Sequence, residues 1–275
     1  MRAVKAKWHS KRFGVQLGHS PESVVTNLRF ADDILLVGRS LPQIKRMIAD
    51  VAAEGAKVGL QLHPDKTKIL HNNIGYGSSA VQANIDGMKI EVLQTGKSAM
   101  YLGRALCLTD CHQVEVEHRI KKAWAKFGLM RRELTDRGVP LQLRLRLFHA
   151  VVTPTVLYGS GSWAMTGERE ALLRTTQLKM LRKVLGKQRL VLSEGDLETW
   201  VDWIKRSTAE VRQLMVAQKI PDWVTEQQVR VQKWSEKLQQ MPSDRWAKRA
   251  LNWKPDGCRS RGRPVTRWTD PSASG

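Results

Sequence analysis

Two adjacent carboxylates, Asp32 and Asp33, interrupt an otherwise apolar stretch of the chain. The β-rich residues 24–30 precede the pair and the apolar run 34–37 follows it. Two short runs of this kind predict a tight β-hairpin with both acids at or beside its tip. If the hairpin is buried, the carboxylates need a cation beside them, because an uncompensated charge in a core is costly. The alternative is a polar turn on the surface.

A divalent metal would supply that cation, and it indicates a class of reaction. Mg²⁺ prefers oxygen ligands and usually keeps waters or substrate phosphates in its shell. In two-metal phosphoryl or nucleotidyl transfer, carboxylates hold two ions about 4 Å apart, one activating the attacking oxygen and one stabilising the leaving group. Asp32 and Asp33 are therefore candidate metal ligands.

The surrounding elements follow from the periodicity of the apolar residues. Ser40 and Gln43 form a capping-box signature ahead of a helix that should end near Gly59. Runs 60–62, 66–70 and 89–93 predict strands. From about residue 110 the period changes from two to nearly four, and helices broken by proline and glycine follow. The sequence thus predicts an α+β chain whose C-terminal part is mainly α-helical.

The net charge of the chain indicates which classes of molecule it can bind. Its 275 residues carry 46 Lys and Arg against 26 Asp and Glu, a formal net charge of +20. Such a chain is attracted to polyanions, with nucleic acid first, an acidic membrane surface second and an acidic protein third. No apolar run reaches the roughly 18 residues of a membrane span, and no signal peptide precedes the first elements. We expect an intracellular protein, nuclear or cytoplasmic, and no membrane partner.

The residues around the aspartates resemble a known family. The segment Leu28 to Leu36, with Phe30-Ala31-Asp32-Asp33 at its centre, resembles the FADD box of reverse transcriptases of non-LTR retrotransposons. Further resemblances follow in the family's order, at residues 59–68, 101–103, 154–163, 177–186 and 262–270. One departure is His63, which stands where the family usually has asparagine. The resemblance spans about residues 13–270.

This resemblance implies a role for each matching residue. Asp32 would be the principal metal ligand, Asp33 its weaker neighbour, and Lys66 the palm lysine near the incoming triphosphate, where it could help to protonate pyrophosphate. Without the resemblance, Lys66 would be a solvated lysine at a strand end. The implied hairpin residues are Phe30 and Ala31, and the implied primer grip is Tyr101, Leu102 and Gly103. Implied partners are an RNA template, an RNA/DNA duplex and deoxynucleoside triphosphates, with Mg²⁺ as cofactor.

One catalytic group of the family has no counterpart in this sequence. The family also needs an aspartate on an earlier palm strand, and its fingers lie upstream as well. The residues before Asp32 contain a single acid, Glu22, without an apolar strand around it. We therefore expect a partial palm and a thumb without fingers, weak or absent Mg²⁺ binding, and no polymerase activity of this polypeptide alone.

Basic residues of the helical half predict a nucleic-acid interface. Residues 101–275 carry 32 basic and 18 acidic side chains, and phosphate contact needs Lys and Arg on one face without base reading. A solvated helix face is the alternative, and for the tail a localisation signal or a disordered segment. Trp268 could stack on a base. The candidates are Lys121, Lys122, Lys126, Arg131, Arg132, Arg144, Arg146, Arg259, Arg261, Arg263, Arg267 and Trp268.

The cysteines and the tryptophans are two further groups of candidate functional residues. Cys107, Cys111 and His112, with Cys258 far away, lack the paired spacing of a zinc knuckle, so a zinc site is disfavoured. The tryptophans of the helical half mostly occupy apolar helix positions, which favours core packing over ligand stacking: Trp124, Trp163, Trp200, Trp203, Trp223, Trp234 and Trp246.

The predicted organisation has five parts. A basic N-terminal segment (1–12) precedes the partial palm (13–109), the helical thumb (110–190), a helical extension (191–255) and a basic tail (256–275). The expected function is that of a fragment of an RNA-directed DNA polymerase from a retrotransposon. The alternative is a non-catalytic, basic nucleic-acid-binding relic of such an enzyme.

Overall fold

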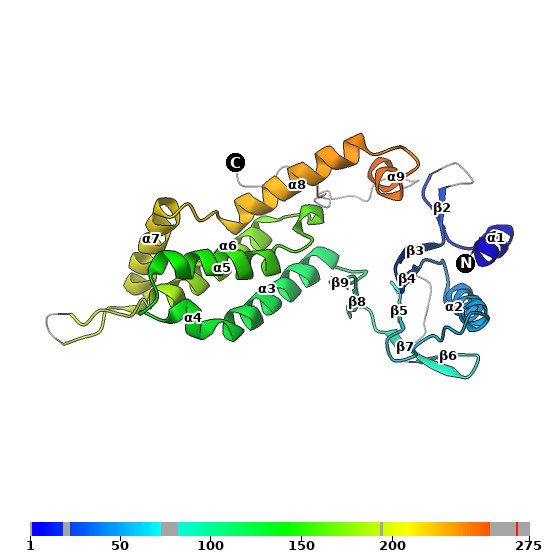
Figure 1. Cartoon of the computed structure of the whole chain (residues 1–275), viewed down its shortest axis with the longest axis horizontal. Coiled ribbons are helices and arrows are strands. Elements are labelled where there is room, and N and C mark those ends of the chain that lie inside the picture. The colour runs from blue at the N-terminus through cyan, green and yellow to red at the C-terminus, as the bar shows by residue number, and fades with distance from the viewer. Residues whose placement is uncertain (1, 19–22, 73–81, 193–194, 254–267, 269–275) are drawn as a thin grey trace, which may run out of the picture. The chain divides into compact units, whose positions relative to one another are not determined.

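The computed structural model describes residues 2–18, 23–72, 82–192, 195–253 and 268 (Figure 1). The chain divides into two compact units, Met1–Val114 with Leu238–Gly262, and Glu115–Lys237 with Arg263–Gly275. Among the described residues, the first, called here the mixed unit, holds the strands and three complete helices; the second, the helical unit, is built from helices. The predicted α+β class with a mainly helical C-terminal part is confirmed.

Small sheets and two helices make up the first 110 residues of the mixed unit. Helix α1 (Arg2–Ser10) precedes the antiparallel pair β1 (Val15–Gln16) and β2 (Val24–Val25). The antiparallel pair β3 (Asn27–Phe30) and β4 (Asp33–Leu36) then leads to helix α2 (Leu41–Ala56). A three-stranded sheet follows in the order β5-β7-β6, from β5 (Lys68–Leu70), β6 (Gln82–Ile85) and β7 (Met88–Leu93). The pair β8 (Ala99–Tyr101) and β9 (Arg104–Leu106) comes last.

One of the two hydrogen bonds of the predicted capping box at α2 is confirmed. The Oγ of Ser40 accepts a hydrogen bond from the Gln43 backbone N–H at 3.3 Å. The Oε1 of Gln43 then accepts from the backbone N–H groups of Arg39, at 2.8 Å, and Gly14, at 3.3 Å. Because Gly14 precedes β1, this one side chain ties the strand entrance to the start of α2. The helix ends at Ala56, three residues before the predicted end.

The α2 helix covers the three-stranded sheet and separates two small cores (Figure 1). Ile48 packs with the sheet residues Ile69, Ile90 and Val92. The predicted strand 89–93 is confirmed as β7, whereas the predicted strand 60–62 is wrong: these residues form no strand, and they follow a tight turn at Gly59, where φ is +77°. The predicted strand 66–70 begins only at Lys68, because residues 64–66 form a turn.

The N-terminal basic segment is a helix docked on α2. Val4 and Trp8 of α1 are buried against Met47. The Asp50 carboxylate accepts hydrogen bonds from the Lys7 ammonium, at 2.6 Å, and from the Trp8 indole N–H, at 3.0 Å. Burial raises the pKa of Asp50, but these two hydrogen bonds and the positive charges of Lys7 and Arg46 outweigh it, so the pKa lies below the usual aspartate value.

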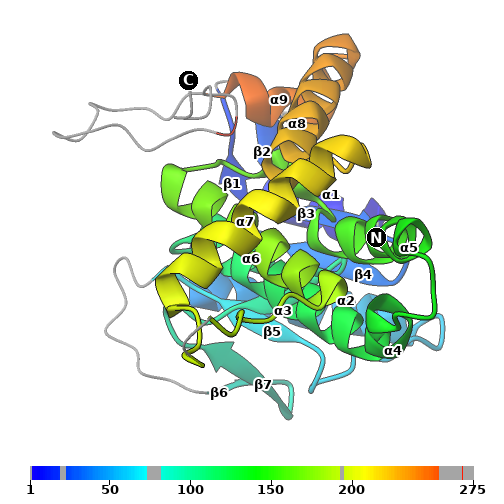
Figure 2. The same ribbon diagram turned by 90° about the vertical axis from the view of Figure 1, so that its left-hand side faces the viewer.

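The helical unit has one continuous apolar core. Its helices are α3 (Cys111–Leu129), α4 (Arg131–Thr135), α5 (Leu141–Val156), α6 (Gly167–Leu185), α7 (Trp200–Ala217) and α8 (Trp223–Gln240), with the 3₁₀ turn η2 (Ser160–Ser162) after α5. Helix α7 lies across α6 (Figure 2). Buried residues from all of these helices belong to the same cluster, including Phe127, Leu134, Phe148, Met180 and Val211. Residues of the predicted extension 191–255 therefore share a core with the predicted thumb.

Tryptophans and one glutamine fix the connection into α8. Trp163 and Trp223 are completely buried, as core packing predicts, and the Trp223 ring stacks on Phe148 with centroids 5.9 Å apart. The Trp223 indole N–H donates to the Thr153 hydroxyl at 3.0 Å. The Gln177 side chain donates to the Pro221 carbonyl and accepts from the Trp223 backbone N–H, each at 2.9 Å. One buried amide thus satisfies two buried backbone groups.

Glycines lie at or near the ends of two of these helices. Gly186 caps α6 with φ at +62°, and Gly159, which precedes η2 three residues after α5, has φ at +70°. Both lie in the left-handed region that glycine adopts without steric cost. After Gly186, the Lys187 N–H donates back to the Arg182 carbonyl at 3.1 Å. This six-residue closure is a Schellman motif.

A connecting segment between α6 and α7 exposes apolar side chains. Arg206 pairs with Glu198 at 2.7 Å and also donates to the Gln188 carbonyl, which fixes both ends of the segment. The hydrogen-bonded Arg206 lowers the pKa of Glu198 to about 2. More than half of the surface of Leu190, Val191, Leu197, Trp200 and Val201 is nevertheless exposed. Trp200 is therefore an exception to the prediction that the tryptophans pack in the core.

The last described helix is α9 (Trp246–Asn252), in the mixed unit. Within the described ranges, no helix combines the length and the apolar character that crossing a membrane requires.

Candidate metal site and nucleic-acid interface

The predicted aspartate hairpin forms as β3 and β4. Phe30 pairs with Asp33 across the hairpin, so Ala31 and Asp32 make its two-residue turn. Ala31 has a φ of +51°, a conformation that alanine rarely adopts, and it allows the strands to reverse within two residues. Asp32 thus lies at the tip and Asp33 begins the return strand, as the sequence predicts.

The surroundings of this tip differ from the buried hairpin considered from sequence. Asp32 and Asp33 are both exposed, and Phe30 exposes 66% of its surface. Leu28 and Ile34, nearer the base, remain 38% exposed. Exposed carboxylates keep their hydration, so burial does not force a cation upon them. Among the described residues, β3 and β4 pair with no further strand, so no third strand extends their sheet.

The β8–β9 hairpin lies beside the aspartate hairpin. Leu102 and Gly103 form its two-residue turn, with φ angles of +49° and +74°. The Tyr101 hydroxyl reaches the Leu28 carbonyl at 3.5 Å, a long and weak hydrogen bond. Burial raises the pKa of Tyr101, and the negative charge of Asp33 raises it further. Two motifs about 70 residues apart in sequence therefore meet, one presenting the carboxylates and the other a tyrosine.

Lys66 is exposed in the turn before β5. Its backbone N–H donates to the His63 carbonyl at 3.2 Å. No hydrogen bond or ion pair between described residues joins its ammonium to either aspartate. Its role near a triphosphate stays a prediction.

The oxygen donors at the hairpin do not fit a two-ion centre. The part of the chain that the structure describes contains no group of three or more Asp, Glu, His or Cys side chains able to share a metal. Glu22 lies outside the described residues. Two neighbouring carboxylates can hold a single hydrated ion, but two bridged ions need a further carboxylate. We derive no catalytic step through magnesium from this set.

Most of the predicted phosphate contacts on the helices face solvent. Lys121 and Lys122 on α3, Arg131 and Arg132 on α4, and Arg146 on α5 are exposed, whereas Lys126 is half-buried. Lys121, Lys122 and Lys126 share α3, whereas Arg131 and Arg132 belong to α4, because α3 ends at Leu129 and α4 starts at Arg131.

The surroundings of His118 reflect the charge of the α3 surface. Burial lowers the pKa of His118, and the positive charges of Arg119, Lys122 and Lys121 lower it further, while Glu115 acts in the opposite direction. Burial is thus the main cause of the lowered pKa of His118.

Arg144 is a correction to the predicted interface. It is buried, with 8% of its surface exposed, and its guanidinium donates to the carbonyls of Val139, at 3.1 Å, and Val184, at 2.5 Å. Val184 is near the end of α6, where carbonyls lack helical partners. Arg144 therefore links α5 to the C-terminus of α6 instead of facing a phosphate.

The remaining predicted residues lie mostly outside the described part. Arg259, Arg261, Arg263, Arg267 and Cys258 are not described, and Trp268 is half-buried. Cys107 is buried, with its Sγ 3.2 Å from the Thr109 hydroxyl, whereas Cys111 is exposed at the start of α3.

Sequence reasoning missed a hollow between α6 and α7, where Arg174, Arg212 and Asp222 meet apolar side chains. These residues are far apart in sequence and belong to no recognisable motif, so only the helix packing reveals them.

Comparison with known proteins gives a distant relative. Over 253 residues, 90% of this chain and 83% of the relative, the sequence is 26% identical to an uncharacterized transposon-derived protein of Caenorhabditis elegans. No protein-family model and no solved structure matches the chain. The likeness supports a transposon origin of the chain. The name of the relative states no activity.

Proposed function

We propose that this chain is the palm-hairpin and thumb part of a non-LTR retrotransposon reverse transcriptase and that it binds an RNA template paired with DNA. The observation that carries the proposal is the meeting of the Asp32–Asp33 hairpin with the Tyr101–Gly103 turn. Both motifs resemble the family, and they come together through the hydrogen bond from the Tyr101 hydroxyl to the Leu28 carbonyl, which neither motif alone requires. The similarity to a transposon-derived protein supports the same origin.

Binding would rest on the exposed basic residues of α3, α4 and α5. Phosphate contacts release counterions, so affinity falls as salt rises. Filter binding of the purified chain to an RNA/DNA hybrid across a salt series tests this property. We expect log Kd to rise linearly with log salt. Lys122→Gln, which removes one phosphate contact, should lower the slope of that line by about 0.9. Affinity that does not fall with salt would contradict the proposal.

Polymerase chemistry would belong to an assembly that adds a further carboxylate to Asp32 and Asp33. We expect no Mg²⁺-dependent primer extension by the 275-residue chain, because the described residues offer only the two carboxylates at the hairpin. Primer extension with the chain, with Asp32→Asn as control, measures this. Extension that the control abolishes would overturn the expected inactivity and establish the polymerase role directly.

The alternative function is a basic nucleic-acid-binding protein that retains no catalysis. The solvent exposure of Asp32 and Asp33 favours it, since no hydrogen bond or ion pair between described residues fixes either carboxylate. Isothermal titration with Mg²⁺ separates the two: binding that Asp32→Asn weakens favours the polymerase part, and equal heats in both proteins favour the relic.

A further inference from the structure

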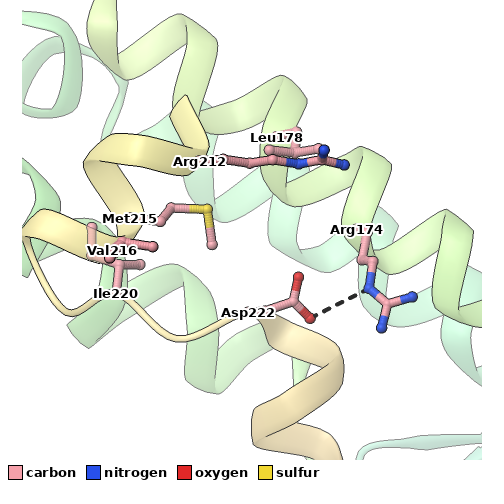
Figure 3. Close-up of a pocket in the computed structure, with 7 residues that line it drawn as sticks. All are labelled: Arg174, Leu178, Arg212, Met215, Val216, Ile220 and Asp222. Atoms are coloured by element: carbon pink, nitrogen blue, oxygen red, sulfur yellow. Dashed lines mark ion pairs between the residues drawn. The ribbon is translucent and has the colours of Figure 1, made fainter. Parts of the chain in front are cut away.

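A hollow of about 400 Å³ opens on the helical unit between α6, α7 and the connection to α8 (Figure 3). It is separate from the basic residues of α3 to α5 on which the proposed duplex binding rests. Its volume lies within the range of about 300–1,000 Å³ that ligand sites occupy. Its lining is Arg174 and Leu178 from α6, Arg212, Met215 and Val216 from α7, and Ile220 and Asp222 from the connection.

The floor of the hollow is apolar. Met215 and Ile220 are almost buried, and Leu178 contributes from the facing helix. Val216 stands at the edge with 80% of its surface exposed. Apolar side chains left open in this way offer a surface on which a flat, weakly hydrated group gains by burial.

Two guanidinium groups lie beside this floor. Figure 3 shows Arg212 reaching from α7 across Leu178 toward α6, where Arg174 also lies. Arg174 shares its charge with Asp222, at 3.7 Å, and with Glu170, at 3.3 Å. Arg212 makes no ion pair or side-chain hydrogen bond with another residue of the described ranges. Its charge is therefore available to an anion that enters the hollow.

The charge around the hollow selects an anionic ligand. Lys179 follows Leu178 and Lys219 precedes Ile220, and both side chains are exposed. Residues 115–237 contain 23 basic and 14 acidic side chains. An anion is thus attracted by the whole unit as well as by Arg212.

We propose that this hollow binds one nucleotide of a single-stranded RNA. The base covers the apolar floor, the phosphate contacts Arg212, and Asp222 accepts a hydrogen bond from a ribose hydroxyl. A nucleotide fits because its base has a flat apolar face, its phosphate is an anion and its ribose hydroxyl is a donor. These groups match the apolar floor, Arg212 and Asp222 of the lining. The inference rests on the proposed nucleic-acid binding and adds a second, single-strand site to it.

Fluorescence anisotropy with two labelled probes tests the site: a 12-nucleotide oligouridylate and a 12-base-pair RNA/DNA hybrid. Val216→Asp places a carboxylate at the edge of the hollow, and Val201→Asp makes the same change on the same helix outside it, where the side chain is 58% exposed. We expect Val216→Asp to weaken oligouridylate binding by about tenfold, because the new carboxylate repels the phosphate and removes apolar surface from the edge of the hollow. Hybrid binding should stay unchanged in both variants.

A second variant tests the phosphate contact without adding a charge. Arg212→Gln should reduce the salt slope for oligouridylate by about 0.7, the value of one single-strand phosphate contact. The same slope for the hybrid should not move. Circular dichroism verifies that each variant keeps its helix content, and the exposed positions of Val216 and Arg212 make such retention the expected result.

The outcomes separate this site from the proposed function. Equal oligouridylate binding by the Val216→Asp and Val201→Asp proteins would overturn the single-strand site, even if hybrid binding persists. Preferential binding of an acidic, apolar peptide over oligouridylate, with the same dependence on Val216 and Arg212, would also overturn it. If the chain without substitutions fails to bind the hybrid, that result would contradict the proposed function instead.

Discussion

Motif residues occupy opposite environments in the two units. In the helical unit, Gln177, Gly159 and Trp163 lie within the packing or at helix ends, where they satisfy backbone groups and fill the core. In the mixed unit, Phe30, Asp32 and Leu102 lie exposed at hairpin turns. The residues of these motifs therefore occupy two different environments. Of the first set, Gln177 and Trp163 are buried in the packing of the helical unit, and the second set is exposed at the turns of two hairpins.

The largest expected effect tests whether the helical unit depends on its buried motif. Trp223→Ala removes the ring stacked on Phe148 and should lower the free energy of unfolding by about 3–5 kcal/mol. Urea denaturation measures the loss, and hydrogen exchange locates it in residues 115–237. Trp200→Ala, at a ring that is 62% exposed, is the matched control and should change stability much less. Equal losses of unfolding free energy in the two variants would contradict the expectation that the buried tryptophan stabilises the unit more than the exposed one.

A smaller effect is expected at the amide that joins α6 to the start of α8. Gln177→Ala leaves the Pro221 carbonyl and the Trp223 N–H without their partner, at a cost of about 1–3 kcal/mol for each buried group. Gln232→Ala, on the exposed face of α8, supplies the control. A loss no greater than that of the control would show that water replaces the Gln177 side chain.

The mixed unit should respond to pH through Asp50. Its pKa is lowered in the folded chain, so the carboxylate stabilises the α1–α2 contact above the unfolded value of about 3.9, and this stabilisation is lost as pH falls through the folded pKa. Asp50→Asn should remove this dependence and cost about 1.5–3 kcal/mol at neutral pH, the range for hydrogen bonds to charged groups. Urea denaturation at pH 7 and pH 3 measures both. A variant that retains the acid sensitivity would place its origin in another group.

The smallest effect is expected at the aspartate hairpin. Phe30→Ser should change the free energy of unfolding by no more than about 0.5 kcal/mol, because the ring is mostly exposed. Ile90→Ala, completely buried in the same unit, should cost about 2–5 kcal/mol. Thermal denaturation compares the two. A large loss of unfolding free energy from Phe30→Ser would mean that the Phe30 ring is covered by other parts of the protein.

Local patterns predicted much of the fold. The hairpin at Asp32, the Ser40 cap and the helical stripes of the C-terminal half follow from alternation, capping chemistry and helical spacing, which depend on neighbours in sequence. The docking of α1 was missed, although Val4 and Trp8 are spaced by one helical turn, because the basic residues around them dominate the segment.

The candidate site was less accessible from sequence. The position of the aspartates in the turn follows from the hairpin, but their exposure depends on which strands cover β3 and β4. Arg144 resembled its exposed neighbour Arg146 in sequence, and only the packing of α5 against α6 distinguishes them. The hollow at Arg212 depends on residues from two helices and a connection, so no single segment could predict it.

The segment between α6 and α7 bears on how the protein behaves in concentrated solution. Its described apolar side chains Leu190, Val191 and Leu197 each expose more than half of their surface, next to the Glu198–Arg206 pair. Self-association is opposed by the mutual repulsion of molecules that carry a charge of +20, and added salt weakens that repulsion. The ionic strength that tests nucleic-acid binding therefore also sets the tendency of the chains to adhere through this segment.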